Sequence, residues 1–371
     1  MTQTPLAPAA VTTRRTARSV LRTVTIASCF PYMALKAAWI SGSHLGVPDG
    51  SPLLDHRTTM AALNGATLLM DSAVLVIALL LTQAWGRRVP AWVLILPMWV
   101  ATGLLLPIMA GYPSQLLVGL AGGDVQGSGH ASRPFLDTWV FGVVYTGFIV
   151  QGLTLGALFA LYARDRWGHL WQGALRDLPR SPTGPAQRLA ATAASLLTLV
   201  PGTMHLLWAT GSATGLDASR IAERNAGFRV MEAIAVFFVA ATVAGVLLLA
   251  FSRRSTLPLA VPLALSWGGS GATACWGGWL AIASLSGVQD ATEQPTAAMM
   301  LTYAVQMLIG TLVVTLGAYF FSERAAVRAS HPSDPHPSEP RTAVSAAPAS
   351  GSSSSGSFAA APPARPSGSG T

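Results

Sequence analysis

The sequence has little charge for its length. Only 10% of its 371 positions are Asp, Glu, Lys or Arg, while 51% are hydrophobic and the mean hydropathy is +0.48. Soluble domains carry about 25% charged residues. This deficit excludes an ordinary soluble globular protein and indicates a polytopic membrane protein whose main partner is the lipid bilayer.

Lysine and cysteine are almost absent. Lys36 is the single lysine among many arginines. An ammonium whose charge can be lost therefore stands where a guanidinium would stay charged. The two cysteines, Cys29 and Cys275, lie in apolar segments. A disulfide would require their two helices to touch, so two unlinked core residues are the favoured interpretation.

Motifs for cofactor chemistry are missing from the sequence. It contains no phosphate-binding loop ending in Gly-Lys-Ser/Thr, no haem attachment sequence, no CxxC pair and no zinc-protease signature. His44, His56 and His130 are scattered without the spacing of metal ligands. We therefore predict no cofactor and no metal.

Apolar stretches long enough to cross a bilayer, at about 20 residues each, occur eight times. They lie at 19–40, 61–83, 91–111, 138–162, 189–209, 229–251, 257–285 and 297–321. No small-residue cleavage site follows the first stretch, so we interpret it as a retained anchor and not a cleaved signal. The predicted fold class is all-α, with eight transmembrane helices.

Arginines are unevenly distributed over the loops between these stretches. If the N-terminus is cytoplasmic, the inner side holds roughly three times as many arginines as the outer side. This bias predicts a multi-pass protein of the cell membrane with both termini in the cytoplasm. The net charge of +8 is explained by these orientation signals and does not indicate a nucleic-acid partner.

The two halves of the membrane region share a sequence pattern. A basic residue and a tryptophan lead into a Ser/Thr-Gly-Ser loop in both halves, and an asparagine precedes an acidic residue by seven positions in both. The matched pairs are Lys36 with His205, Trp39 with Trp208, Asn64 with Asn225, Asp71 with Glu232, Tyr145 with Tyr303, and Asp165 with Glu323. The same order in both halves indicates a duplicated unit.

Four helices in each copy predict two parallel repeats, related by an axis along the membrane normal. The predicted organisation is a basic cytoplasmic N-terminus (1–18), a first four-helix repeat (19–168), a cytoplasmic linker (169–188), a second four-helix repeat (189–324) and a disordered cytoplasmic tail (325–371). The tail is assigned from its Pro, Ser, Ala and Gly content, which buries too little apolar surface to offset ordering.

Charged residues inside the predicted spans mark the candidate site. Inserting one into hydrocarbon costs about 2.5–3.5 kcal/mol, so such residues are functional hypotheses by default. Side chains lean toward the start of their helix, which predicts that Lys36 meets Asp71 and that His205 meets Glu232. Asp71 and Glu232 are the candidate proton acceptors or donors of a catalytic or transport step.

The remaining candidates are assigned to substrate binding, together with Lys36 and His205. Asn64 lies on the helical face of Asp71, and Asn225 is predicted to share a face with Glu232. Trp39 and Trp208 fall at the predicted outer interface. Each charge pair can equally be a structural ion pair that pins two helices, and asparagines often serve as interhelical anchors.

Three function classes stay open from the sequence. The first is a pseudosymmetric transporter or permease, and the second is a membrane-embedded enzyme that uses a carboxylate on a lipid or isoprenoid, by analogy with membrane-bound terpene cyclases. The third is a structural or accessory role. The general pattern resembles multi-pass membrane proteins of high-GC actinobacteria, which implies no activity. Neither the substrate nor the oligomeric state follows from these residues.

Overall fold

The computed structural model describes residues 8–49, 51, 54, 57–125, 136–179, 181–252, 254–285 and 294–330. Residues 1–328 form one compact unit, and residues 329–371 are grouped separately. Most of the predicted tail, from residue 331 onward, lies outside the described residues, as do His56 and His130.

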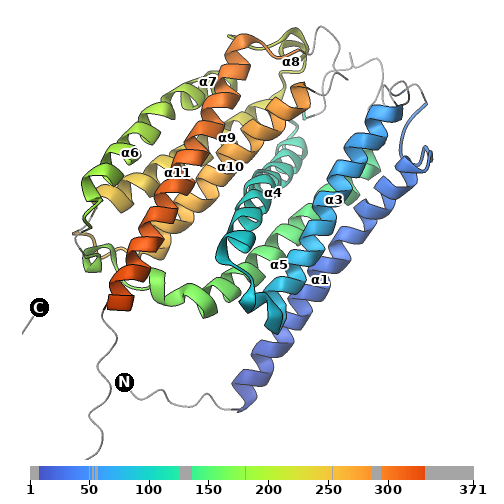
Figure 1. Ribbon diagram of the computed structural model, residues 1–371. Coiled ribbons are helices and arrows are strands. Elements are labelled where there is room, and N and C mark those ends of the chain that lie inside the picture. The colour runs from blue at the N-terminus through green and yellow to red at the C-terminus, as the bar shows by residue number, and fades with distance from the viewer. Residues whose placement is uncertain are drawn as a thin grey trace, which may run out of the picture. The chain divides into compact units, whose positions relative to one another are not determined.

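Helices account for nearly all of the described secondary structure (Figure 1). The only β pairing there is an isolated bridge between Ala174 and Pro258, so the predicted all-α class is confirmed. The helices are α1 (Pro8–Ile40), α3 (Arg57–Thr82), η1 (Ala84–Arg88), α4 (Ala91–Leu120), α5 (Thr138–Trp171), η2 (Leu175–Asp177), α6 (Gly184–Leu197), α7 (Leu199–Ala209), α8 (Ala218–Ala222), α9 (Ala226–Phe251), α10 (Ala260–Ser284) and α11 (Ala297–Ser330).

Two helix boundaries differ from the sequence expectation in an informative way. The fifth predicted stretch is broken into α6 and α7 at Thr198, whose hydroxyl donates to the Ser195 carbonyl at 2.6 Å. Pro201 stands in the first turn of α7, where its missing N–H costs least. At the other end of the repeat, α11 continues to Ser330, past the predicted start of the tail at residue 325.

Six helical segments are long and apolar enough to cross a membrane. They are Thr58–Thr82, Ala91–Leu120, Thr138–Trp171, Gly184–Ala209, Ala226–Phe251 and Ala297–Val327. The two predicted spans outside this set are α1, which carries Lys36 and several arginines, and α10, whose middle is rich in glycine, serine and threonine. A multi-pass membrane protein is therefore supported, while the count of eight is not confirmed.

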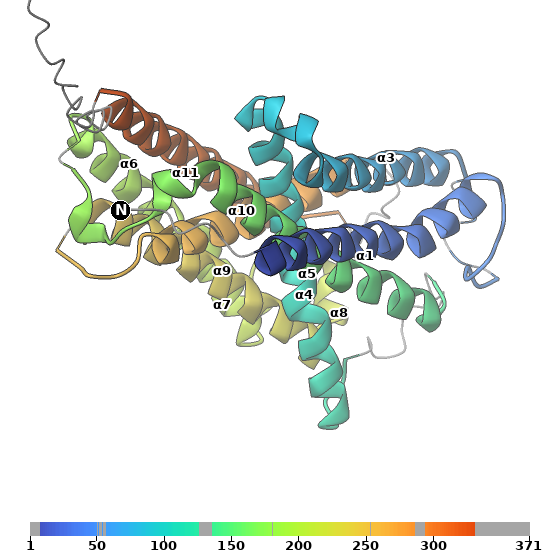
Figure 2. The ribbon, with the colours of Figure 1, turned by 90° about the horizontal axis from the view of Figure 1, so that it is seen from below.

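The helices pack in two groups that meet along α4. Buried side chains such as Cys29, Ala78 and Leu158 join α1, α3, α4 and α5, while Ala194 and Val246 belong to a core shared by α6, α9 and α11. Figure 2 shows α1 and α3 on one side of α4, with α6, α9 and α11 on the other. Because α4 contacts both α9 and α10, these three helices form the interface between the groups.

Glycines allow α10 to cross both α4 and α9 with the helix backbones in contact. A Cβ atom on Gly103 would lie 2.4 Å from the carbonyl oxygen of Gly271, and one on Gly269 would lie 2.6 Å from the amide nitrogen of Thr242. Backbones approach this closely only where a side chain is absent, as at the small-residue interfaces of membrane helices.

This crossing predicts an asymmetric response to adding one methyl group. Gly103→Ala is expected to lower the stability of the protein by about 1–3 kcal/mol, because the neighbour is backbone and cannot rotate away. Gly156→Ala on α5 is the matched control, since a Cβ atom there meets nothing within 4 Å. Thermal unfolding of the full-length protein in detergent measures both. Equal melting temperatures for the two variants would contradict the tight crossing.

Candidate functional site

The first charge pair is enclosed between α1 and α3. The Lys36 ammonium lies 2.6 Å from Asp71 Oδ2 and 3.8 Å from the centroid of the Tyr32 ring. Lys36 is 1% exposed. The ammonium thus has a carboxylate and an aromatic face as partners, which is the arrangement expected of a satisfied buried ion pair.

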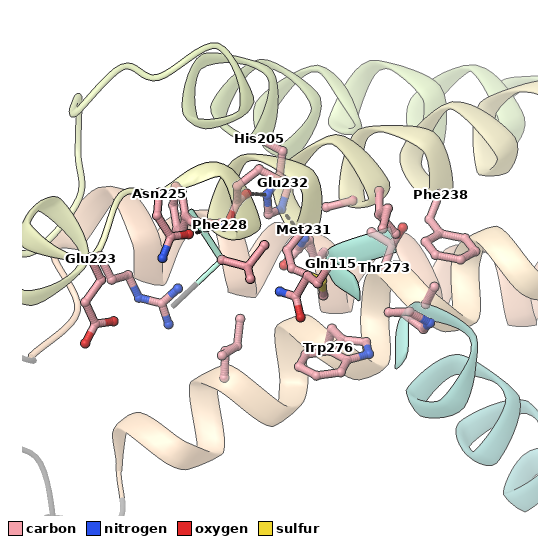
Figure 3. Close-up of a pocket in the computed structure, with 18 of the residues that line it drawn as sticks. Gln115, His205, Glu223, Asn225, Phe228, Met231, Glu232, Phe238, Thr273 and Trp276 are labelled. Atoms are coloured by element: carbon pink, nitrogen blue, oxygen red, sulfur yellow. Dashed lines mark hydrogen bonds and ion pairs between the residues drawn. The ribbon is translucent and has the colours of Figure 1, made fainter. Parts of the chain in front are cut away.

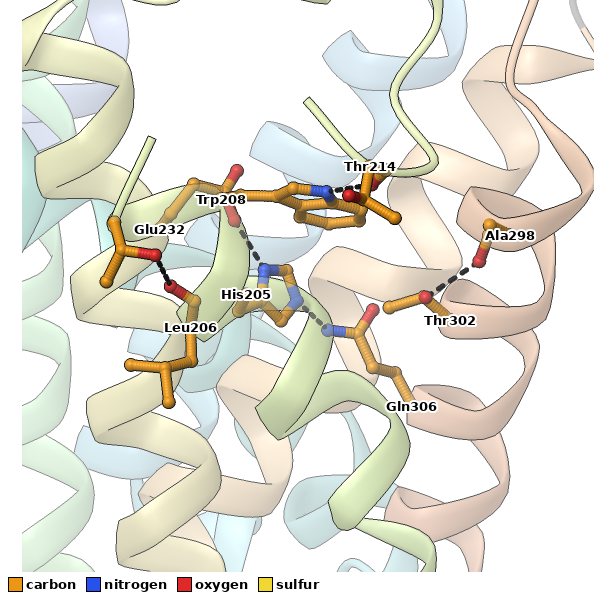
Figure 4. A network of polar contacts seen from close by, with 9 residues as sticks. His205, Leu206, Trp208, Thr214, Glu232, Ala298, Thr302 and Gln306 are labelled. Atoms are coloured by element: carbon orange, nitrogen blue, oxygen red, sulfur yellow. Dashed lines mark hydrogen bonds and ion pairs between the residues drawn. The ribbon is translucent and has the colours of Figure 1, made fainter. Parts of the chain in front are cut away.

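The second pair joins α7 to α9 and extends to α11 (Figure 4). His205 Nδ1 lies 2.5 Å from Glu232 Oε2, and His205 Nε2 lies 2.8 Å from the side-chain nitrogen of Gln306. An amide nitrogen only donates, so His205 Nε2 accepts this bond and Nδ1 carries the proton toward Glu232. In this arrangement His205 Nδ1–H donates to the Glu232 carboxyl group.

Trp39 and Trp208 each form a hydrogen bond to the loop that follows their helix. The Trp39 indole N–H donates to the Leu45 carbonyl at 2.7 Å, and the Trp208 indole N–H donates to the Thr214 carbonyl at 2.9 Å. Trp208 also packs edge-on against His205, with ring centroids 5.2 Å apart. Their indole hydrogen bonds are therefore already used within the protein.

The two asparagines occupy different structural positions. Asn64 lies inside α3, where its side chain donates to the Met60 carbonyl at 3.0 Å. Asn225 is instead the N-cap of α9, and its side-chain oxygen accepts from the Phe228 N–H at 2.8 Å. Asn225 therefore begins the helix that carries Glu232, a position that asparagine favours, and both residues line the same cavity.

The loops after α1 and α7 have the same backbone conformation. Gly42 and Gly211 both have φ of 96°, and the next glycines, Gly46 and Gly215, have φ of 72° and 74°. These values lie in the left-handed region that favours glycine. Both loops then meet the start of a later helix: Gly46 packs against Val140 of α5, and Gly215 against Ala298 of α11.

A third matched contact lies at the opposite end of the helices. Arg18 of α1 pairs with Asp165 of α5. At the corresponding positions, the Gln187 amide of α6 donates to Glu323 of α11 at 3.0 Å, and the hydroxyls of Ser181 and Thr183 also donate to that carboxylate.

The His205–Glu232 pair borders a cavity. A space of about 650 Å³ lies between α4 and α5 on one side and α7 to α11 on the other (Figure 3). Its lining includes His205, Glu232 and Gln306 but neither Lys36 nor Asp71. Other lining residues are Pro107, Gln115, Phe141, Arg220, Glu223, Asn225, Phe228, Met231, Phe238, Thr273 and Trp276.

Two polar atoms in the cavity wall have no hydrogen-bond partner among the described residues. They are Gln306 Oε1 and Thr273 Oγ1, and each residue is 4% exposed. A buried polar atom left unpaired costs about 1–3 kcal/mol. The cavity wall thus contains two buried polar atoms whose hydrogen-bonding capacity is unused among the described residues.

Three residues of the cavity wall, Thr273, Trp276 and Gln306, are not among the site candidates that the sequence predicts. The signal for Gln306 lies in the repeat, because the offset that matches Tyr145 to Tyr303 also matches Phe148 to Gln306. Phe148 packs edge-on against Tyr32, with centroids 5.2 Å apart. A glutamine in place of this aromatic residue marks the second copy as the one with polar chemistry.

Charged side chains at the cavity rim complete the site. Arg220 lies 3.6 Å from Asp217, and Glu223 is exposed. The described part of the chain holds no group of three potential metal ligands, and Cys29 and Cys275 are both free.

No protein-family model, curated protein or solved structure matches this chain.

Proposed function

We propose that this protein is a proton-linked permease of eight membrane helices, arranged as two parallel four-helix repeats. The observation that carries the proposal is the His205–Glu232 pair, a buried imidazole–carboxyl contact in the wall of a cavity between the two helix groups. In transporters built from repeats, substrate sites lie near the membrane midplane at the repeat interface.

Matched contacts at three levels support the duplication. The loop contact of Gly46 corresponds to that of Gly215, the Lys36–Asp71 pair corresponds to His205–Glu232, and the Arg18–Asp165 pair corresponds to Gln187–Glu323. By this correspondence α1 is equivalent to α6 and α7, and α10 is equivalent to α4. Because the equivalents of α1 and α10 are apolar enough to span, we assign all eight as membrane helices.

The shape of the cavity supports access from one side at a time. The lining reaches the exposed Glu223 at the rim, whereas helix backbones touch one turn beyond its deepest residues. Those contacts are Gly269 on Thr242 of α9 and Gly103 on Gly271. A cavity open at the rim and packed beneath is the arrangement that alternating access requires of one of its two conformations.

The two copies have divided their roles in this proposal. Lys36 and Asp71 serve as a structural pair, because Tyr32 and Phe148 fill the space around them. His205 and Glu232 serve as the proton site, because imidazole is the side chain whose ordinary charge change falls between pH 5 and 8. Asn225 contributes as the N-cap of α9, the helix that carries Glu232.

The arginine bias orients the protein with both termini in the cytoplasm, so the cavity rim faces outward. This predicts labelling of Ser43→Cys, in an exposed loop after α1, by a membrane-impermeant thiol reagent added to intact cells. Gln83→Cys, at the opposite end of α3, is expected to react only after lysis. Both are made with Cys29 and Cys275 replaced by alanine. Labelling of Gln83→Cys in intact cells would reverse the orientation.

The function is tested in sealed vesicles. The full-length protein is reconstituted into liposomes that contain a pH-sensitive dye, and a panel of small cations, anions and neutral solutes is added outside. A permease linked to protons gives a pH change that depends on the solute and on the protein. A protein that moves no proton with any solute, across the whole panel, contradicts the proposal.

A membrane-embedded enzyme is the second candidate, favoured by the aromatic side chains in the cavity. Phe141, Phe228, Phe238 and Trp276 surround the same space as Glu232, and a carboxylic acid among aromatic rings suits protonation of an apolar substrate. The two candidates differ in one requirement. An enzyme converts lipid or isoprenoid in detergent without a sealed membrane, whereas a permease needs two compartments.

A further inference from the structure

The Gln306 side chain lies beside His205, and both residues line the cavity together with Glu232. Its amide nitrogen donates to His205 Nε2 at 2.8 Å, while its oxygen is buried without a hydrogen-bond partner among the described residues. A carboxamide offers donors on one side and an acceptor on the other. Rotating the amide by half a turn therefore exchanges the group that faces His205 with the group that is unpaired.

The protonation of His205 decides which orientation is favourable. A neutral imidazole that gives its Nδ1 proton to Glu232 has an acceptor at Nε2, and this acceptor needs the amide nitrogen. A protonated imidazole has N–H groups on both nitrogens, so its Nε2–H needs the amide oxygen. Protonation of His205 is therefore expected to turn the Gln306 oxygen toward the imidazole.

The free groups of the cavity are suited to a ligand that donates hydrogen bonds. Among the described residues, Gln306 Oε1 and Thr273 Oγ1 have no hydrogen-bond partner, and Glu232 uses Oε2 for His205, which leaves its Oε1 for a ligand. The rings of Trp276 and Phe228 line the same space. Carboxylate and carbonyl oxygens beside aromatic faces are the groups that recognise an ammonium.

The charge of the cavity favours the same ligand. Among its lining residues, Glu232 and Glu223 are acidic and Arg220 is basic, while the Gln115 side chain is uncharged. Asp217 lies beside Arg220, and Tyr303 is the nearest other titratable group on α11. With His205 neutral the lining carries a net negative charge, and protonation of His205 cancels it. A proton and a cationic ligand thus compete for one site.

Building on the proposed permease function, we propose that the cavity binds a small organic cation with N–H donors, and that Gln306 couples its binding to release of the proton from His205. When the cation is bound, the Gln306 oxygen accepts from it and the amide nitrogen donates to neutral His205. When His205 is protonated, the same oxygen accepts from the imidazolium and the cation leaves. The exchange is one cation for one proton.

The test measures binding to the full-length protein in detergent with 2-phenylethylammonium as the probe. Its neutral and anionic relatives, 2-phenylethanol and phenylacetate, are the ligand controls. Isothermal titration at pH 8 and pH 5.5 is expected to show affinity for the ammonium about tenfold or more weaker at the lower pH, since imidazole changes charge in this interval. Weaker or no binding is expected for both controls.

Two variants separate the coupling from simple binding. His205→Asn keeps an N–H for Glu232 but cannot take up a proton, so its affinity for the probe is expected to be the same at both pH values. Gln306→Leu removes the acceptor and is expected to weaken binding about tenfold, the equivalent of about 1.4 kcal/mol. Gln151→Leu, at a buried glutamine outside the cavity lining, is the matched control and keeps wild-type affinity.

Each outcome decides a different point. Equal affinity at both pH values in the wild type overturns the coupling, and preference for phenylacetate or 2-phenylethanol overturns the ligand class. Equal losses in Gln306→Leu and Gln151→Leu remove Gln306 from the site. Failure of Gln306→Leu to fold shifts the test to Thr273→Val, expected to weaken binding several-fold. Cation binding without any flux in vesicles leaves this site standing and contradicts the permease.

Discussion

Replacing Glu232 by glutamine is expected to abolish proton-linked flux, with a fall of about 10²-fold or more, the usual size of a lost proton-transfer group. Glutamine keeps an oxygen that accepts the His205 Nδ1–H bond, now 2.5 Å long, but it carries no charge. The cavity then loses its buried anion, and protonation of His205 is no longer stabilised. Stability and expression are expected to survive, because the volume and one hydrogen bond are conserved.

Flux into liposomes, with melting temperature measured on the same preparation, checks this expectation. His205→Lys is the companion variant, because a fixed charge at this position is expected to flatten the dependence of flux on pH between 5 and 8. An unchanged pH profile in His205→Lys removes His205 from the mechanism. Full flux in Glu232→Gln returns the pair to a structural role.

Replacing Asp71 by leucine is expected to destabilise the protein by about 3–5 kcal/mol, the cost of breaking a buried ion pair from one side. Lys36 is 1% exposed, and its ammonium would keep only the Tyr32 ring as a partner. The double variant Lys36→Met with Asp71→Leu removes both charges and is expected to recover most of the loss. Melting temperatures of the wild type, of Asp71→Leu, of Lys36→Met and of the double variant complete the double-mutant cycle.

Flux separates the two copies further. Because Lys36 and Asp71 do not line the cavity, the double variant is expected to keep its flux and its pH profile. If the double variant were as unstable as Asp71→Leu, the two side chains would stabilise the protein by more than neutralising each other's charge. A stable double variant without flux would place the first pair in the transport mechanism.

The pattern of the sequence was sufficient for the helices and for the pairing of charges. Apolar length predicted the positions of the long helices, since a bilayer demands about 20 residues per span. Helical spacing and the lean of side chains predicted that Lys36 meets Asp71 and that His205 meets Glu232, which lie 2.6 and 2.5 Å apart. These are properties of one helix and its neighbour in sequence, and short-range geometry decides them.

The tertiary structure decided which of the two pairs adjoins a cavity. The sequence matches Lys36 to His205 and Phe148 to Gln306, but it does not show that Tyr32 packs beside Lys36 whereas Gln306 and an open cavity adjoin His205. The position of Thr273 in the cavity wall likewise depends on which helices pack against α10. A cavity is the space left after helices distant in sequence have packed, so it depends on which side chains meet across helices. Periodicity gives the face of each helix, and packing alone gives its partner.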